Sequence, residues 1–236
     1  MTYKLGKTAA IKPFGLGTLG TYVAGRLPVT PTSVSVPTCA DWGMMDNDRL
    51  GDCTIAGVGH IIVAANIEVQ ELDAIPNDAQ ISAQYMAFTG GQDVGCNESV
   101  VLREWYKHGL FGKTNKIAGY APVNMQSEVH TAIAMYGACY VGVQCPESAQ
   151  EQFQANEPWT VVPDSPIEGG HCIVFVGYDP EYLYAVTWGG IAAVSYPWWA
   201  TYGDEAWAVI SQEFNESNGN GRVNLPELQA DLNLLR

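Results

Sequence analysis

The sequence predicts an α+β fold in which a helical half packs against an antiparallel β half. Helix-like patterns fill the first part of the chain, and strand-like runs separated by Gly, Pro and Asp follow after Ala138. The helix expected to begin at Cys53 is apolar on most sides, so it should be buried. We expect the two halves to meet at a cleft that could bind a substrate.

Composition and charge exclude several classes of partner. The 236 residues suffice for a full hydrophobic core, and a net charge of -14 opposes binding to nucleic acid or to an anionic membrane. The apolar run from Ile61 stops at Asn66, and we find no signal peptide or transmembrane segment. The six cysteines show neither a CxxC pair nor zinc-site spacing, which favours reduced thiols, an intracellular protein and no metal or cofactor.

The chain divides into three parts. Residues 1–38, rich in Pro and Gly, are predicted to form an extended arm that lies over the globule or docks on a neighbouring subunit. Residues 39–215 are predicted as the main domain, with a helical half at about 39–137 and a β-rich half at about 138–215. Residues 216–236 are expected to form a polar turn and a terminal helix.

Turn and cap residues place the individual elements. Asp52 is a suitable N-cap for a helix from Cys53 to about Leu72. Further helices are expected at 78–90, 99–108 and 124–136, and strands at 139–143, 159–162, 173–178, 182–188 and 206–210. The stretch 216–227 superficially matches a calcium loop, but its first position is Glu216 instead of Asp, and we prefer the turn.

Cys53 and His171 form the candidate catalytic pair. A helix N-terminus favours thiolate over thiol, so we expect a lowered pKa for Cys53. His171 follows Gly169-Gly170 at the start of a buried strand and would act as the base. His60 lies about two helical turns beyond Cys53, too far to serve, and is predicted to be a core histidine. Taken singly, a buried cysteine at a helix start is often only a small hydrophobe.

Over about residues 39–210 the chain resembles the papain-like cysteine peptidases. In that family an oxyanion-hole Gln precedes the nucleophile by six residues, and a Gly-Ser pair directly precedes it; Asn47, Gly51-Asp52 and Cys53 stand there in this sequence. The chain looks more narrowly like poorly characterised papain-like proteins from bacteria and their phages. Its marks are the Asn47 to Thr54 stretch, Gly169-Gly170-His171, Thr187-Trp188-Gly189 and Asp204-Glu205-Ala206.

The resemblance implies hydrolysis of a peptide or amide bond in a peptide or protein bound between the halves. Cys53 would be the nucleophile, His171 its partner and Asn47 an oxyanion donor. Trp188, Gly51 and Gly170 are the expected binding residues, with Trp188 shielding His171 from water. An amidase acting on cell-wall peptides would use the same chemistry.

One departure from the family pattern affects the third catalytic position. Val186 stands where the family has the Asn that orients the histidine, and Val cannot accept a hydrogen bond. If Val186 points at His171, Thr187 points to the other face of the strand. A backbone carbonyl or a carboxylate such as Asp204 could replace the missing acceptor.

The alternative function is that of a structural or binding protein on the same scaffold with weak or no catalysis. The arm, the acidic surface and Val186 favour it. A phage head or tail accessory subunit that uses its arm to contact neighbours is one form. A cytoplasmic or virion-associated location would be compatible with either function.

Overall fold

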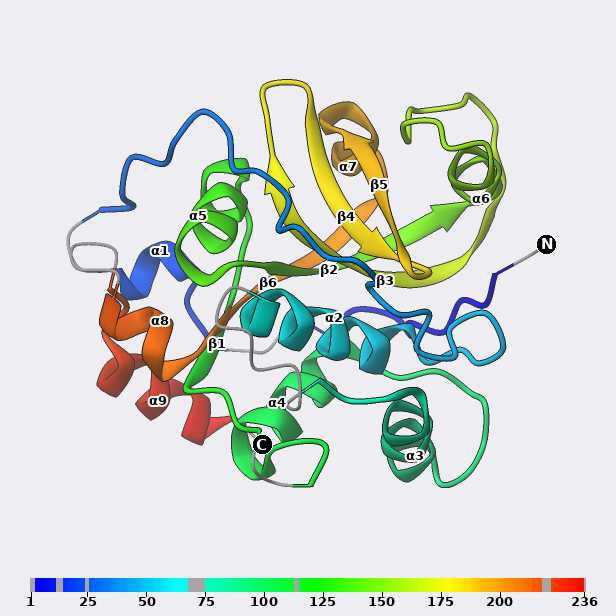
Figure 1. Cartoon of the computed structure of the whole chain (residues 1–236). Coiled ribbons are helices and arrows are strands. Elements are labelled where there is room, and N and C mark those ends of the chain that lie inside the picture. The colour runs from blue at the N-terminus through cyan, green and yellow to red at the C-terminus, as the bar shows by residue number, and fades with distance from the viewer. Residues whose placement is uncertain are drawn as a thin grey trace.

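The β half of the molecule is a six-stranded sheet whose neighbouring strands pair antiparallel. Its strands are β1 (Gly119–Pro122), β2 (Cys139–Pro146), β3 (Ile167–Tyr178), β4 (Tyr182–Thr187), β5 (Gly190–Ser195) and β6 (Gly203–Ile210). The computed structural model, which describes residues 3–11, 15–23, 26–67, 75–112, 115–217 and 222–235, places them in the order β1-β6-β2-β3-β4-β5 (Figure 1).

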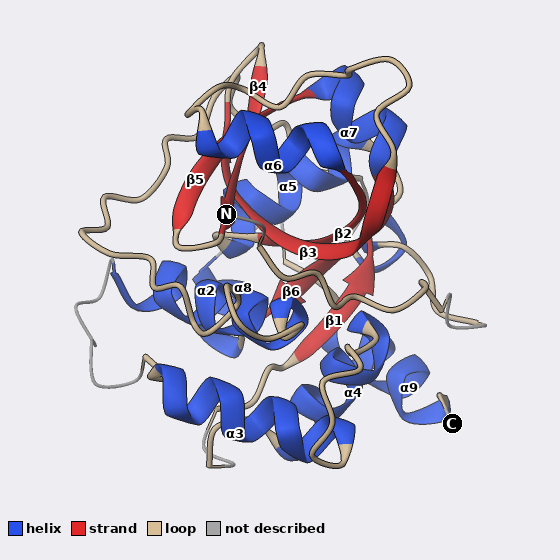
Figure 2. Ribbon diagram, turned by 90° about the vertical axis from the view of Figure 1, so that its right-hand side faces the viewer, coloured by secondary structure: helices blue, strands red, loops and turns tan. Residues whose placement is uncertain are grey.

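Helices supply the other half. The four longer helices that precede β2 are α2 (Cys53–Ile67), α3 (Asp78–Thr89), α4 (Glu98–His108) and α5 (Gln126–Tyr136). Figures 1 and 2 show α2 directly against β2 and β3, with α3 and α4 on the side of α2 that faces away from the sheet. The predicted α+β class is confirmed. The strand β1 belongs to the sheet, although it falls inside the range expected to be helical.

The central helix α2 is buried as expected. Every side chain from Cys53 to Ala64 is buried, since the helix lies between the sheet and the other helices. The predicted end near Leu72 falls in 68–74, outside the described residues. Gly57 allows close contact with the sheet: a Cβ there would lie 2.8 Å from Tyr140 Cε2 and 2.9 Å from Cys172 Sγ.

Local capping explains where the neighbouring helices begin and end. The side chain of Asn77 accepts from the N–H of Gln80, and Gln80 returns a bond to the Asn77 N–H, so the cap precedes Asp78. Asn97 caps α4 by accepting from the N–H groups of Ser99 and Val100. Gly90 ends α3 in the left-handed region, at φ 63°.

The strand predicted at 159–162 is wrong. Only Trp159 pairs, through an isolated bridge to Val194, and the chain then turns at 163–164. Pro158 and Pro163 bracket the stretch and lack the N–H that a ladder requires. The elements that the sequence analysis does not predict include α6 (Glu147–Gln154), α7 (Tyr196–Tyr202) and β5.

The N-terminal arm packs on its own chain and is not wholly extended. It contains the one-turn helix α1 (Leu19–Tyr22), and the Tyr22 hydroxyl donates to Asp231 at 2.7 Å. Val34 bridges to Tyr178 on the sheet. The chain closes with α8 (Gln212–Ser217) and α9 (Leu225–Leu234), the expected terminal helix. The calcium-like stretch includes 218–221, which lie outside the described residues.

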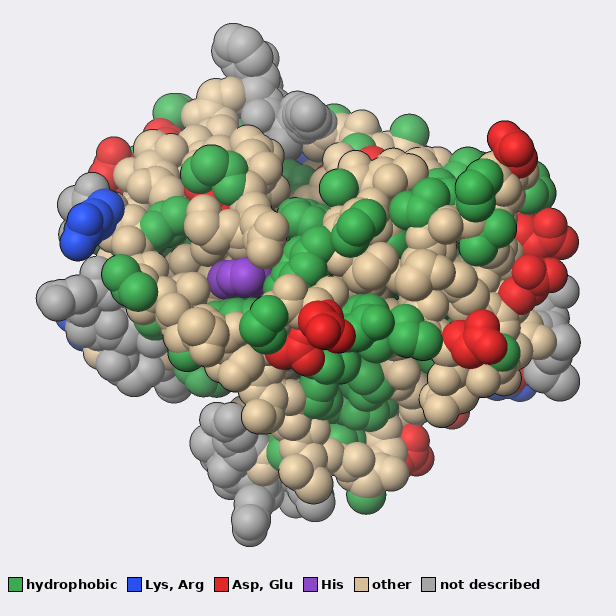
Figure 3. Space-filling model, turned by 90° about the horizontal axis from the view of Figure 1, so that it is seen from above, with side chains coloured by type: hydrophobic (Ala, Val, Ile, Leu, Met, Phe, Trp, Pro, Cys, Tyr) green, Lys and Arg blue, Asp and Glu red, His purple; other side chains and the backbone are tan. Residues whose placement is uncertain are grey.

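The surface agrees with the acidic composition. Acidic side chains are visible at several places on the face in Figure 3, including its centre, where they lie among hydrophobic ones. In the part of the chain that the structure describes, no helix has both the length and the apolar character needed to cross a bilayer.

Replacing Gly57 by Ala should destabilise the fold, although Ala normally favours a helix interior over Gly. The new methyl group would meet Tyr140 and Cys172 at less than van der Waals distance, and such overpacking costs about 1–3 kcal/mol. Urea unfolding of the two proteins measures the difference. A gain of about 0.5–1 kcal/mol, the normal effect of Gly to Ala in a helix, would contradict this close contact.

Candidate active site

Cys53 opens α2 and is buried against the sheet. The Asp52 carbonyl accepts from the N–H groups of Ile55 and Ala56 at 2.7 and 3.0 Å, so Cys53 is the first helical residue. The Cys53 thiol lies against backbone hydrogen-bonding groups of Cys172, the residue after His171, and of Gly6. Only 1% of the Cys53 surface is exposed. The helix therefore brings the sulfur to the strand that carries the histidine.

The lowered pKa expected for Cys53 is wrong for this structure. Burial raises the pKa of the thiol to about 12, and the backbone groups of Cys172 and Gly6 oppose this shift only in part. A helix dipole contributes about 0.3–1 kcal/mol, less than one pKa unit, whereas full burial shifts a pKa by up to about 3–5 units. Desolvation therefore prevails, and the thiol is neutral.

His171 is held on β3 by one ring nitrogen. Its Nε2 and the hydroxyl of Thr187 are 2.7 Å apart. The second nitrogen, Nδ1, is buried and has no hydrogen-bond partner among the described residues. It is therefore not hydrogen-bonded to Cys53 either. Burial lowers the pKa of His171 to about 3, and the nearby His60 adds to the shift, so the ring is neutral. One nitrogen is thus anchored and the other is free.

Thr187, and not Val186, faces the histidine. Val186 pairs with Val174 across β3 and β4, and paired residues share a face of the sheet. Residue 174 is three positions from His171, so Val186 lies on the opposite face, and Thr187 faces His171. Asp204, the other acceptor considered, instead binds Lys7 and Gln144. Alignment by position pointed to Val186, and the strand register was needed to identify Thr187 as the residue that faces His171.

Trp188 covers the histidine ring. The two rings stack with centroids 4.5 Å apart and planes 16° apart. Trp188 sits at φ 45°, in the left-handed region, where the chain turns from β4 into β5. Tyr3 of the N-terminal arm stacks on Trp188 in turn, at 4.7 Å and 10°. These aromatic contacts keep water from the His171 side of the site.

The remaining predicted residues contact the N-terminal arm. Asn47 donates through Nδ2 to the Leu50 carbonyl at 3.2 Å and, at the longer distance of 3.5 Å, to the Lys4 carbonyl. A Cβ on Gly51 would lie 3.0 Å from the Leu5 carbonyl oxygen. A Cβ on Gly170 would overlap the Lys7 carbonyl oxygen. Glycine at these positions allows the backbone of another segment to approach.

That segment, residues 3–8, covers the site, and we call it the covering segment. Main-chain hydrogen bonds attach it: Lys4 N–H to Asn47 O at 3.3 Å, Lys7 N–H to Gly170 O at 3.0 Å, and Thr8 N–H to Cys96 O at 2.9 Å. It runs from Trp188, past Asn47 and Cys53, to Cys96, between α2 and β3 (Figure 1). This position of the arm is not predicted from the sequence. The close approach requires glycine at position 6, where a Cβ would overlap the Gly51 carbonyl.

Of the comparisons with known proteins, only the one with solved structures finds similar proteins. No family model and no curated protein matches the sequence. Xylellain, a cysteine protease from Xylella fastidiosa, has a similar structure, with a TM-score of 0.62, 16% identity, and coverage of 89% of this chain and 98% of that one. The cysteine protease and lectin-like domains of Cwp84, a surface-layer associated protein of Clostridium difficile, match with a TM-score of 0.58 and 12% identity. The match covers 88% of this chain and 56% of that one.

A third solved structure is the Amb a 11 cysteine protease, a ragweed pollen allergen in its proform. It matches with a TM-score of 0.50 and 14% identity over 80% of this chain and 67% of that one. Because the sequence identities are low, the structural similarity establishes the fold alone. The chain has the fold of the papain-like cysteine proteases.

Replacing Thr187 by Val should destabilise the folded chain by about 1–3 kcal/mol, because His171 Nε2 would be left buried without a partner. Ser keeps the hydroxyl, so Thr187→Ser should retain most of the stability. Urea unfolding of the three proteins makes the comparison. Equal losses in both variants would show that the hydroxyl contributes nothing.

His171 and His60 should remain neutral at about pH 5, below the usual histidine pKa of about 6.5. Burial lowers their pKa values to about 3 and about 4. Their contribution to stability is therefore complete above about pH 6.5 and is lost as the pH falls through the folded-state values. Nitrogen NMR of histidine-labelled protein measures the ring protonation, with the urea-unfolded chain as control. Protonation of His171 above about pH 6 would contradict the burial argument.

Proposed function

We propose that the protein is a cysteine hydrolase that cleaves a peptide or amide bond through Cys53 and His171. The observation that carries the proposal is a histidine anchored through Nε2, with Nδ1 unpartnered, on the strand that packs against the cysteine helix. A neutral imidazole with a free nitrogen can accept the proton of a neighbouring thiol.

The proposed reaction proceeds in two stages. The Cys53 thiol transfers its proton to His171 Nδ1 as its sulfur bonds to the substrate carbonyl carbon. The oxyanion receives a hydrogen bond from Asn47 Nδ2, which here donates to the Lys4 carbonyl. His171 then protonates the leaving amine as the C–N bond breaks. Water hydrolyses the resulting thioester, which releases the acid and restores the thiol.

Catalysis in this scheme requires the covering segment to leave. Residues 3–8 occupy the space beside Cys53, Asn47 and Gly170 where a substrate backbone would bind. Departure of the segment would admit water and reduce the desolvation that keeps the thiol neutral. The helix N-terminus and His171 would then favour the thiolate.

One observation favours the alternative of a non-catalytic scaffold: the thiol is fully buried and its pKa is raised to about 12. In that case the papain-like fold would serve as a structural or binding protein, such as a phage virion accessory subunit. The described arm residues contact their own chain. Docking of the arm on a neighbouring subunit therefore stays a prediction, as do a bacterial or phage origin and the cytoplasmic or virion location.

Lys7→Glu should start turnover of fluorogenic peptide or amide substrates. The introduced carboxylate would be repelled by the carboxylates of Asp204 and Glu205, which pair with the Lys7 ammonium, and this repulsion would release the covering segment. Lys4→Glu makes the same charge change at an exposed position of that segment and should leave turnover at the wild-type level.

Adding Cys53→Ala to Lys7→Glu should abolish the activity, whereas adding Cys39→Ala, at a partly exposed cysteine that has no role in the proposed reaction, should not. Adding His171→Ala should lower kcat about 10²-fold or more. Activity that survives Cys53→Ala, or a Lys7→Glu protein that folds, exposes Cys53 and still turns over no substrate, would rule out the hydrolase and leave the scaffold.

A further inference from the structure

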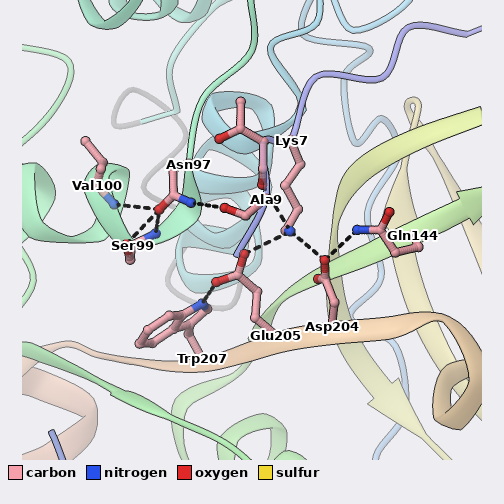
Figure 4. A network of polar contacts seen from close by, with 10 residues as sticks. Lys7, Ala9, Asn97, Ser99, Val100, Gln144, Asp204, Glu205 and Trp207 are labelled. Carbon is pink, nitrogen blue, oxygen red and sulfur yellow. Dashed lines mark hydrogen bonds and ion pairs between the residues drawn. The ribbon is translucent and has the colours of Figure 1, made fainter. Parts of the chain in front are cut away.

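The Lys7 side chain of the covering segment is fully buried in an acidic pocket. Its Nζ lies 2.9 Å from Asp204 Oδ2 and 2.9 Å from Glu205 Oε1, both on β6, and donates to the Thr8 carbonyl at 3.3 Å (Figure 4). A buried ammonium is costly unless it is paired in this way. Burial alone would lower the pKa of Lys7, but the charges of Glu98 and Glu205 and the hydrogen bonds to Asp204 and Glu205 raise it above its usual value, so the group is charged.

The walls of this pocket are held by contacts of their own. The Gln144 amide donates to Asp204 at 2.7 Å, and the Trp207 indole donates to Glu205 at 3.1 Å (Figure 4). Gly142 on β2 leaves the space for the lysine stem, since a Cβ there would overlap Lys7 Cε. The two carboxylates are thus positioned by protein groups other than Lys7. Such preorganisation is typical of a binding site.

Glu98 adds a third carboxyl group, which is not one of the two carboxylates paired with Lys7. It is completely buried at the start of α4, and neither oxygen has a hydrogen-bond partner among the described residues apart from the weak thiol of Cys172. It lies close enough to Lys7 to raise the lysine pKa. A guanidinium group, with five donors, could use these oxygens as well as those of the β6 pair.

The pocket adjoins the proposed reaction centre. The main-chain N–H of Lys7 donates to the carbonyl of Gly170, directly before His171. The preceding residue, Gly6, lies against the Cys53 thiol. A side chain that enters the pocket therefore belongs to a residue one or two positions from the group at the sulfur.

We infer that Glu98, Asp204 and Glu205 form a recognition pocket for the Lys or Arg side chain of a peptide bound at Cys53. This inference rests on the proposed function and names its substrate class. Lys7 occupies the pocket in the structure as the chain's own basic side chain. The net charge of -14 would also attract a cationic peptide.

A binding experiment tests the pocket without requiring turnover. In full-length Lys7→Ala, n-butylguanidinium or n-butylammonium should raise the Tm by about 2–4 °C, whereas n-butanol should not. Wild type and Lys7→Met, in which a side chain fills the pocket, should not respond. Lys7→Ala/Glu205→Gln should lose the response, and Lys7→Ala/Glu157→Gln, altered at an exposed carboxylate, should keep it. Equal effects of the cations and butanol would overturn the inference.

A specificity experiment tests the substrate class. Full-length Lys7→Glu, which releases the covering segment, is offered fluorogenic tetrapeptides that vary the two residues before the scissile bond. At one position, Arg or Lys should exceed norleucine at least about tenfold in kcat/KM. Glu205→Gln or Asp204→Asn should remove this preference by lowering kcat/KM for the Arg and Lys peptides more than for the norleucine peptide, and Glu157→Gln should retain it.

The outcomes separate this inference from the proposed function. Cleavage of peptides with no preference for Arg or Lys at either position overturns the inference and leaves the hydrolase in place. A positive response to the cations, with no peptide cleaved, supports the acidic pocket and overturns the hydrolase. A preference that survives both carboxylate substitutions assigns recognition to other residues and overturns the inference.

Discussion

Close packing of α2 against β2 and β3 determines where the candidate chemistry can occur. Gly57 allows the helix to contact Tyr140 and Cys172 directly, and Cys53 lies one turn earlier on the same helix. Because Cys172 is the neighbour of His171, the contact that forms the centre of the core also brings the cysteine to the histidine strand. A loosened helix would therefore lose both stability and the alignment of the site.

Desolvation governs the chemistry of the covered site. The covering segment, Trp188 and Tyr3 exclude water, and the low-dielectric surroundings favour the neutral forms of both Cys53 and His171. The same segment carries a charge into the protein, because Lys7 is buried against the β6 carboxylates. The covered state depends on these ion pairs of Lys7. A substitution that breaks them should therefore change the reactivity of Cys53.

The sequence predicts the parts of this arrangement that follow from local pattern. The apolar run from Cys53, the Gly-Gly-His171 strand and the α+β order are all visible in it, because apolar runs and hydrophobic periodicity are local properties of the sequence. The partner of His171 needed the strand register, and alignment by position led to Val186 when alternation places Thr187 on the histidine face. The covering segment and the Lys7 pocket depend on contacts between residues about 200 positions apart, such as Lys7 and Asp204. No local pattern encodes these contacts.

The rate of iodoacetamide alkylation at Cys53, followed by peptide mass spectrometry near neutral pH, tests the covered cysteine–histidine site most directly. We predict that wild type and Lys4→Glu react slowly at Cys53, whereas Lys7→Glu reacts faster there than an ordinary thiol with a pKa of about 8.5. The partly exposed Cys39 supplies the internal reference. Rapid labelling of Cys53 in wild type, or equally slow labelling in Lys7→Glu and wild type, would contradict this account.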